Sequence, residues 1–453
     1  MNQPEGYAVK NQEKKVYKLK KAIYGLKQAS WAWNKQADKS LKGLGFDCCL
    51  SDSGVYIRKG KDSTLVVVLY VDDILFMGSN SQELQKAKNA FMKLWECRDL
   101  GKVKEYLGMR INHNKVARTL IIDQEDYAKK IVKRFGLENA KPTRTALPTG
   151  YVPIPNDKQA SPETISYFQQ IIGSLLYLAL GMRPDIVYQV ILMSQFCANP
   201  SDQHVHMALY IVCHVHTTEK AKILFNGISK LGFVAFADAD WAADRISRKS
   251  VTGYVILLAG GAISWVSRKQ KTVALSSTEA EYMCMSDCSQ QIAWIESLMN
   301  EFSFDIKTID LCCDNQGAMF LASNPAQEHR SKHIDIRYHY IRECVDENKV
   351  RLTYIPTNEQ IADIMTKNLT YDKIVQFRDK MGIIFDDSKI SLKFHNTILK
   401  VWSTWLQEFQ QSKADDHHER MLQKICDVDA TSYVRDMIEY YEKEIQRYKK
   451  KQH

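Results

Sequence analysis

The chain has 453 residues, of which 45% are hydrophobic and 25% are charged, and its formal net charge is +9 at pH 7. This length predicts two or three domains, and the composition is that of a globular protein with apolar cores, which excludes an intrinsically disordered chain. The positive charge favours polyanionic partners only weakly, because many proteins without nucleic-acid ligands carry as much.

The eleven cysteines are scattered, with adjacent pairs at Cys48-Cys49 and Cys312-Cys313 and no CxxC motif. This pattern argues against a disulfide framework and a structural zinc site, and it favours reduced thiols. The N-terminal residues contain no apolar stretch of signal-peptide type, and no apolar run is long enough to span a bilayer. We therefore expect an intracellular protein of the cytoplasm or nucleus with no membrane partner.

The first segment, residues 1–138, mixes helical and strand patterns. Two apolar, β-branched runs, 65–71 and 74–77, flank Asp72 and Asp73. The pattern predicts a hairpin whose turn carries the two carboxylates. Asp-Asp is also an ordinary surface turn dipeptide. The functional alternative is that the hairpin presents oxygen ligands to Mg²⁺, as in two-metal polymerases.

The rest of the chain changes character three times. Five prolines and weak apolar periodicity predict a linker, an apolar stretch then predicts helices, and alternating strands and helices follow. The last part has a helical, charge-balanced pattern from which no function is readable. The predicted segments after the first are 139–162 (linker), 163–228 (helical connection), 229–370 (strands and helices) and 371–453 (tail).

The segment 229–370 predicts three strands, a helix, a strand, helical turns, a strand and a final helix. The first strand runs into Asp238, and a hairpin turns at Gly260-Gly261. Ser277 or Thr278 is a plausible N-cap of the long helix. The predicted elements are strand 231–238, hairpin 250–269, helix 276–302, strand 308–314, helix 315–322, helix 333–348, strand 350–356 and helix 358–368.

Acidic residues recur at corresponding points of these elements. Asp238 and Asp314 end two strands, Glu279 or Glu281 opens the long helix, and Asp363 lies in the last helix. Each alone is a common residue at a strand end or helix start. Four converging carboxylates would repel strongly unless cations neutralised them, so the joint pattern predicts a metal site.

Several motifs resemble those of the copia-type (pseudovirid) LTR retrotransposon Pol polyproteins, in family order and up to about residue 382. Tyr70 to Asp73 resembles the YxDD box of reverse transcriptases, and four later stretches resemble ribonuclease H blocks. The matching stretches are NQPEGY at the start, KLKKAIYGLKQASWAWN (18–34), EYLGMRI (105–111), QEDYAKKIVKRFG (124–136), YFQQIIGSLLYLALGMRPDI (167–186), FADADWA, SSTEAEYM, DNQGAMFLASNP and EQIADIMTK.

The resemblance implies an α+β or α/β multidomain chain. A partial reverse transcriptase with palm, thumb and connection would be followed by a ribonuclease H-like mixed sheet with flanking helices. In the family, a strand carrying a further metal-binding aspartate precedes the QPEG stretch, and it is absent here. We therefore expect an incomplete polymerase site, with Asp72 and Asp73 as its remnant. Two departures, Ser30-Trp31 after KQA and CHVHTT at 213–218, suggest relaxed constraint.

The implied chemistry is two-metal hydrolysis of RNA in RNA–DNA hybrids, with Mg²⁺ or Mn²⁺ as cofactor. Carried over by motif, the metal-binding and catalytic residues are Asp238, Glu281, Asp314 and Asp363, with Glu279 as the rival to Glu281. Asp240, His333 and His339 are expected to be structural or to face substrate. Candidate nucleic-acid contacts, for which solvated loop charges are an equal alternative, are Gln28, Arg245, Arg248, Lys249, Arg268, Lys269 and Lys271.

The expected partners are RNA–DNA hybrid, RNA template, DNA and other parts of the Pol polyprotein. A virus-like particle is the expected location if the parent element is active. Two alternatives stay open. The chain is a catalytically dead relic that at most binds nucleic acid, or it is a working reverse transcriptase whose missing strand comes from elsewhere.

Overall fold

A computed structural model of the chain describes most residues up to 385. Arg245, His333 and the predicted tail beyond residue 385 lie outside the described residues, whereas its first part, 371–385, is described and contains a helix and a short strand. The described residues are 2–3, 5–7, 12, 14–23, 25–61, 63–226, 232–244, 247–304, 306–324 and 336–385.

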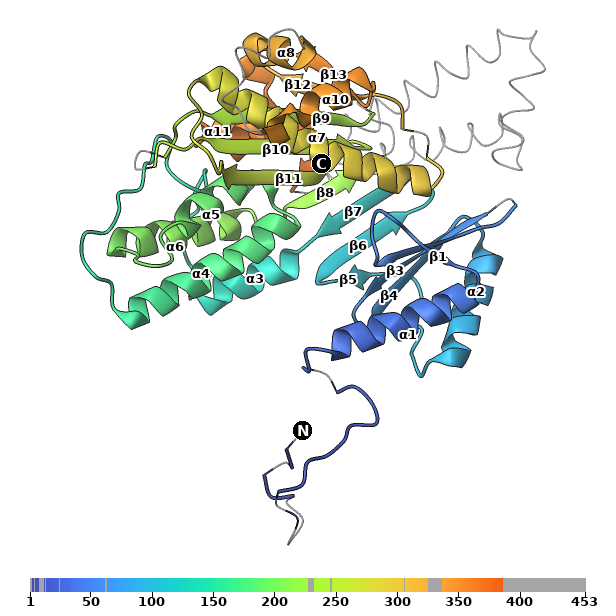
Figure 1. The fold of residues 1–453 in the computed structure, drawn as a ribbon. Helices are drawn as coiled ribbons and strands as arrows, with labels where there is room; N and C mark the ends of the chain where they lie inside the picture. The colour runs from blue at the N-terminus through green and yellow to red at the C-terminus, as the bar shows by residue number, and fades with distance from the viewer. Residues whose placement is uncertain are drawn as a thin grey trace, which may run out of the picture. The chain divides into compact units, whose positions relative to one another are not determined.

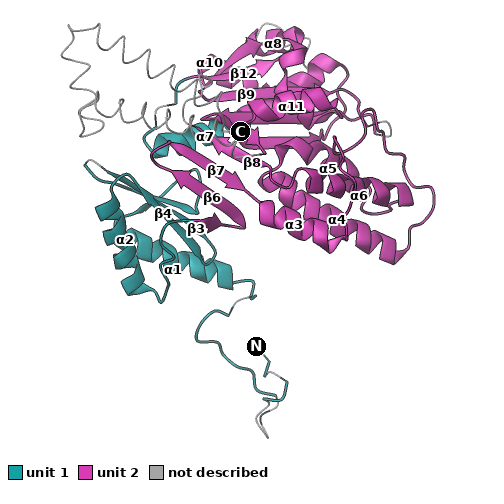
Figure 2. Cartoon of the chain, turned by 180° about the vertical axis from the view of Figure 1, so that it is seen from behind, with its two compact units in different colours: residues 1–103, 292–307 teal, residues 104–291, 308–453 magenta. Residues whose placement is uncertain are grey.

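The chain divides into two compact units, each described here by itself (Figure 2). Unit 1 contains residues 1–103 and 292–307, and unit 2 contains residues 104–291 and 308–453. The long helix α7 therefore contributes residues to both. Within the described residues, no helix is both long and apolar enough to cross a membrane.

Unit 1 is built on a four-stranded antiparallel sheet whose strands follow chain order. In β3 the side chains alternate, so that Leu65, Val67 and Leu69 are buried with helix residues such as Phe91. The opposite face of the same strand packs against Leu298 at the end of α7. The elements are α1 (Ala29–Gly43), β1 (Asp47–Cys48), β2 (Val55–Lys59), β3 (Thr64–Tyr70), β4 (Asp73–Gly78), α2 (Ser81–Leu94) and the last part of α7 (Ser277–Glu301).

Unit 2 contains two five-stranded sheets and most of the helices (Figure 1). The first sheet has the order β14-β8-β7-β6-β5 and is antiparallel throughout. Its strands are β5 (Glu105–Tyr106), β6 (Met109–Asn114), β7 (Thr119–Asp123), β8 (Lys222–Phe225) and β14 (Ile383–Ile384). The helices between β7 and β8 are α3 (Glu125–Arg134), α4 (Pro162–Gly181), the 3-10 helix η1 (Pro184–Ile186), α5 (Val187–Ser194) and α6 (Asp202–Thr217).

The second sheet has the order β11-β10-β9-β12-β13, with antiparallel pairing up to β9 and parallel pairing from β9 to β13. The central strand β9 is buried over six of its seven residues. Its strands are β9 (Val234–Asp240), β10 (Val251–Leu258), β11 (Gly261–Lys269), β12 (Ile309–Cys313) and β13 (Val350–Tyr354). The remaining helices are α8 (Gln316–Ser323), η3 (Ile336–His339), α10 (Tyr340–Asp346), η4 (Thr357–Glu359), η5 (Ile361–Met365) and α11 (Tyr371–Lys380).

The order of these elements agrees with the sequence-based prediction, with three local corrections. The predicted last helix, 358–368, is two short 3-10 helices, η4 and η5. The N-cap of α7 is Ser276, whose hydroxyl accepts a hydrogen bond from the Glu279 N–H, rather than Ser277 or Thr278. The hairpin turn lies at Ala259-Gly260, where both residues have positive φ.

The predicted linker is packed rather than free. It contains no helix or strand before Pro162, but Ala146 and Leu147 are buried in a core shared by the helices α3–α6, the sheet around β9 and α11. Trp265 of β11 also donates a hydrogen bond to the Ala179 carbonyl of α4. Apolar burial therefore joins the predicted connection to the later segment, and the boundaries at 138, 162, 228 and 370 stay predictions.

A buried ionic network lies between α6, η1 and α11. Asp185 receives two hydrogen bonds from Arg183 and one from Arg378, whose Nη2 also lies 2.8 Å from His214 Nε2. Although burial opposes its charged form, the two arginines hold the pKa of Asp185 well below its usual range. Arg183 reaches Thr218 as well. His214 and Thr218 belong to the CHVHTT stretch, so two residues of this stretch take part in the buried network.

Candidate active site

Two of the predicted carboxylates meet because their strands are parallel neighbours. Phe236 of β9 pairs with Cys312 of β12, and Asp238 and Asp314 each follow two residues later. Asp314 directly follows β12, whereas Asp238 lies two residues before the end of β9, which extends to Asp240 rather than ending at Asp238 as predicted. Both therefore lie near the carboxyl ends of two neighbouring parallel strands.

The start of α7 adds the third carboxylate and separates the two glutamates. Both Glu279 and Glu281 are buried, but a Glu279 carboxylate oxygen accepts a hydrogen bond of 2.9 Å from the Leu275 N–H. Glu281 instead lines a cleft with Asp238 and Asp314. The preference for Glu281 as the cleft-facing residue therefore agrees with the geometry.

Close packing at a glycine brings the fourth predicted carboxylate, Asp363, close to Asp238. Gly253 of β10 pairs with Asp238, and a Cβ at this position would lie 2.5 Å from Thr366 Cγ2. Only glycine allows η5 to lie this close to the strand. The buried Gln360 side chain also donates to the Ala237 carbonyl, which fixes η5 beside β9. Asp363 is buried on η5 as a result.

A lysine that the sequence reasoning did not select connects Asp363 to Asp238. Lys367 Nζ lies 2.9 Å from Asp363 Oδ1 and 3.3 Å from Asp238 Oδ2. The Thr366 hydroxyl donates to the same Asp238 oxygen. The one available signal was spacing, because Lys367 follows Asp363 by four residues and so lies on the same side of a helical turn.

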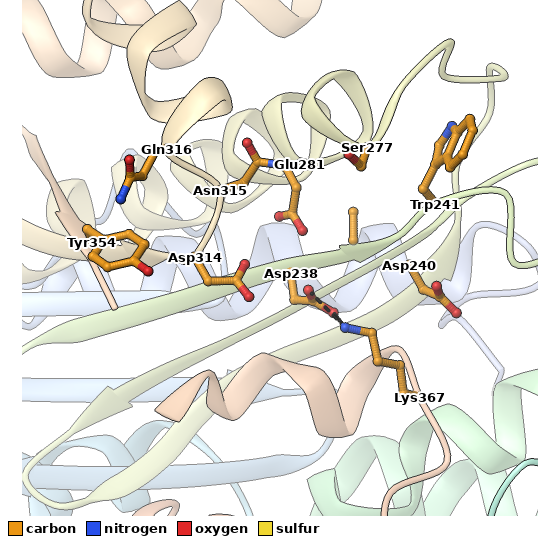
Figure 3. A pocket seen from close by; sticks show the side chains of 11 residues that line it. Asp238, Asp240, Trp241, Ser277, Glu281, Asp314, Asn315, Gln316, Tyr354 and Lys367 are labelled. Atoms are coloured by element: carbon orange, nitrogen blue, oxygen red, sulfur yellow. Dashed lines mark hydrogen bonds and ion pairs between the residues drawn. The ribbon is translucent and has the colours of Figure 1, made fainter. Parts of the chain in front are cut away.

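The carboxylates of Asp238, Glu281 and Asp314 point toward one another in an open cleft of about 660 Å³ (Figure 3). Ligand atoms of Glu281, Cys313 and Asp314 lie within 4.8 Å of one another, the one such group of three found in the described part of the chain. Glu281 is 5% exposed, and its Oε2 has no hydrogen-bond partner. A buried, orphaned carboxylate oxygen facing two other carboxylates fits a hard divalent cation.

The electrostatics of the cluster support this fit. Burial raises the pKa of Glu281 well above its usual range, and repulsion from Asp238 and Asp314 adds to it. Burial and Asp238 raise the pKa of Asp363 to about 6, against the opposing effect of Lys367. Burial likewise raises the pKa of the Cys313 thiol, which leaves oxygen atoms as the ligands of this site.

The raised pKa of Asp363 gives a stability prediction with a definite sign. The folded chain binds this proton more tightly than the unfolded chain, so the free energy of unfolding contributed by Asp363 falls as pH rises from about 4 to about 6. Without metal, the free energy of unfolding of Asp363→Asn should therefore rise by about 2–3 kcal/mol relative to that of wild type as the pH increases from 4 to 7. Urea unfolding in EDTA across this range measures the difference, and a difference independent of pH would contradict the prediction.

The predicted nucleic-acid contacts lie in different environments. Arg268 pairs with Asp287 at 2.7 Å, and Lys269 forms an ion pair with Asp244. Arg248 is exposed in the loop before β10, while Lys249 is half-buried. Exposed Lys271 follows β11, exposed Gln28 precedes α1, and His339 Nδ1 lies 2.8 Å from the Tyr282 hydroxyl.

The other predicted metal site is the tip of the β3–β4 hairpin in unit 1. Tyr70 pairs with Asp73, so Val71 and Asp72 form the two-residue turn, and Val71 has a φ of +53°. This conformation is rare for a β-branched residue, and Trp33 donates its indole N–H to the Val71 carbonyl. Asp72 and Asp73 are exposed, and within the described residues no further acidic, histidine or cysteine side chain completes a cluster of three with them.

Comparison with known proteins shows which family the chain belongs to. Residues 1–149 match the family model "Reverse transcriptase (RNA-dependent DNA polymerase)". A retrovirus-related Pol polyprotein from transposon TNT 1-94 of Nicotiana tabacum is 35% identical over 392 residues, which are 84% of this chain and 29% of the relative. A putative transposon Ty5-1 protein of Saccharomyces cerevisiae is 32% identical over 293 residues, which are 64% of this chain and 94% of the relative.

The chain belongs to the Pol polyprotein family of copia-type retrotransposons. A second Pol polyprotein relative, from transposon RE1 of Arabidopsis thaliana, is 34% identical over 84% of this chain. The chain spans 29% and 26% of the length of the two long Pol polyprotein relatives. A ribonuclease H1 structure from Halobacterium salinarum is 21% identical over 30% of the chain, but its TM-score of 0.19 is too low to carry an argument.

Proposed function

We propose that this copia-type Pol chain hydrolyses the RNA strand of RNA–DNA hybrids at the cleft around Asp238, Glu281 and Asp314. The observation that carries the proposal is the orphaned Glu281 Oε2, buried and facing two further carboxylates. The strand order, three antiparallel strands followed by two parallel ones, supports the proposal because it agrees with the order of elements that the motif resemblance implies.

Asp238, Glu281, Asp314 and Asp363 would hold two Mg²⁺ or Mn²⁺ ions. When bound, these ions would lower the pKa of the attacking water and stabilise the leaving 3′ oxygen. Gln360 and Gly253 position Asp363 by holding η5 against the sheet. The residues thus supply a rigid, anionic cleft, and recognition of the hybrid would depend on its backbone and 2′-hydroxyls rather than on sequence.

The half-exposed aromatic side chains of Trp241 and Tyr354 line the same cleft. They could contact the sugar faces of a hybrid laid over the carboxylates. Arg248 and Lys271 are exposed and have no ion-pair partner among the residues that the structure describes. They are the better candidates for phosphate contacts, because Arg268 and Lys269 already pair with aspartates.

Cleavage of a labelled RNA–DNA hybrid by the purified chain tests the proposal. Wild type should cleave only with Mg²⁺ or Mn²⁺, and Asp314→Asn should lose about a thousandfold or more of this activity because a metal-binding charge is gone. Asp310→Asn is the matched control, since this aspartate of β12 pairs with Arg351 outside the cleft. No metal-dependent cleavage by folded wild type would leave the rival function, a relic that at most binds nucleic acid.

We also propose that the reverse transcriptase segment does not polymerise by itself, because one hairpin supplies only the adjacent Asp72 and Asp73, whereas a two-metal site needs carboxylates from separate strands. Primer extension by the same preparation tests this, and extension of a primer would contradict it. The proposed partners are RNA template, DNA, hybrid and other parts of the Pol polyprotein. The proposed location is the cytoplasm or nucleus, within a virus-like particle if the parent element is active.

A further inference from the structure

Asp238, Asp240, Glu281 and Asp314 line the cleft, and Asp363 is connected to it through Lys367. The negative charges of these carboxylates are not neutralised evenly. Asp238 and Asp363 share the Lys367 ammonium, with Nζ–O distances of 3.3 Å and 2.9 Å. Asp238 also accepts the Thr366 hydroxyl. Figure 3 shows Lys367 reaching Asp238 from the side opposite Glu281. One side of the cluster therefore already contains a fixed positive charge.

On the other side, no lysine or arginine among the described residues forms an ion pair with Glu281 or Asp314, in contrast to Lys367 with Asp238 and Asp363. Glu281 Oε2 has no hydrogen-bond partner, and its ligand atoms lie within 4.8 Å of those of Asp314. A divalent cation entering between Glu281 and Asp314 meets uncompensated negative charge. A second cation between Asp238 and Asp363 must instead displace, or lie beside, an ammonium group already in contact with both.

We propose that Lys367 occupies the place of one divalent cation in the resting chain, so that the cleft binds one ion tightly at Glu281 and Asp314 and a second only weakly. The inference rests on the proposed function, because it assumes the carboxylate metal site. It makes Lys367 a positioning residue that sets how many ions the resting site holds, and the second ion binds only when the lysine moves.

Three features of the chain suit Lys367 to this role. Its side chain is 36% exposed, so the ammonium can move toward solvent or toward a substrate phosphate without opening the core. Its backbone N–H bonds to the Asp363 carbonyl, which fixes where the side chain starts. The residue before it, Thr366, is fully buried and bound to Asp238, so only the lysine side chain has freedom to leave.

Mn²⁺ binding to the whole chain tests this inference without any substrate. Electron paramagnetic resonance of free Mn²⁺ at pH 7.5 should give one tight ion for wild type. Lys367→Met should bind a second ion about tenfold or more tightly than wild type does, because a competing unit charge is gone. Lys367→Arg keeps the charge and should keep one tight ion. Lys88→Met is the control, since Lys88 forms its ion pair with Asp99 within unit 1.

The outcomes separate the inference from the function on which it depends. Unchanged Mn²⁺ binding by folded Lys367→Met, or two equally tight ions in wild type, would overturn the role of the lysine and leave the metal site intact. No tight ion in wild type would overturn the metal site itself. Near-UV circular dichroism reports folding of each variant, and Lys367→Gln replaces the methionine variant if that one does not fold.

Discussion

Glu281→Gln is expected to abolish metal-dependent hybrid cleavage, with a fall of about a thousandfold or more, because a buried cleft-facing oxygen loses its charge. Glu279→Gln should stay within about threefold of wild type, since a glutamine oxygen can still accept the Leu275 N–H. The two substitutions have the same chemistry and lie two residues apart, so neither helix propensity nor expression explains a difference between them. Cleavage rates with Mg²⁺ over the same labelled hybrid measure the effect.

The assignment of Glu281 as the metal-binding glutamate would be contradicted by the reverse order of cleavage activity in the two variants. Loss of activity in Glu279→Gln with retention in Glu281→Gln would mean that the capping glutamate turns into the cleft when metal binds. Equal loss in both, accompanied by a lowered unfolding midpoint, would indicate that the start of α7 is too fragile for the comparison to report on chemistry.

Asp185→Ala is expected to cost about 3–5 kcal/mol in the free energy of unfolding, because it leaves Arg183 and Arg378 buried without their shared anion. Both arginine side chains are at most 5% exposed. Asp310→Ala is the control, since it breaks an exposed pair with Arg351 and should cost at most about 1 kcal/mol. Urea unfolding of the metal-free chain measures both, and a similar small cost for the two variants would contradict the prediction.

Much of the second sheet could be predicted because its signals are local. Asp238 and Asp314 follow apolar, strand-forming runs, and parallel neighbours end at one edge of a sheet, so their meeting follows from topology. The β3–β4 hairpin could also be predicted from the sequence, because β-branched runs flank a two-residue turn. These predictions need only the order of the elements and the periodicity of their apolar residues.

The parts that could not be predicted depend on tertiary contacts. Asp363 lies in a 3-10 turn that is held against the sheet by close packing at Gly253 and by the Gln360 hydrogen bond to the Ala237 carbonyl, and nothing within 358–368 indicates that Gly253 and Ala237 are its partners. The sequence favoured Glu281 over Glu279, and it contains a further signal for the same choice. Ser276 followed three residues later by Glu279 is a capping-box pattern, and it assigns Glu279 to the helix start. Lys367 was overlooked because a lysine on a surface turn is ordinarily solvated.

The ionic network around Asp185 also could not be predicted from the sequence. The CHVHTT stretch suggests relaxed constraint, and nothing in it indicates that His214 Nε2 lies 2.8 Å from Arg378 Nη2. Burial lowers the pKa of His214 to about 3, so the ring is neutral at physiological pH and adds no third positive charge to the two arginines.

The sheet that ends in β14 has a consequence for how the chain is made. Ile383 of β14 pairs with Ile223 of β8, and β8 pairs in turn with β7. The outer edge of β8 is therefore covered only by residues that lie more than 150 positions later in the chain. On a ribosome, β7 and β8 can pair early, but the free edge of β8 stays uncovered until Ile383 and Ile384 have been synthesised. A polyprotein cut or prematurely terminated between the last carboxylate and β14 would keep every acidic residue of the cleft yet expose that edge to self-association.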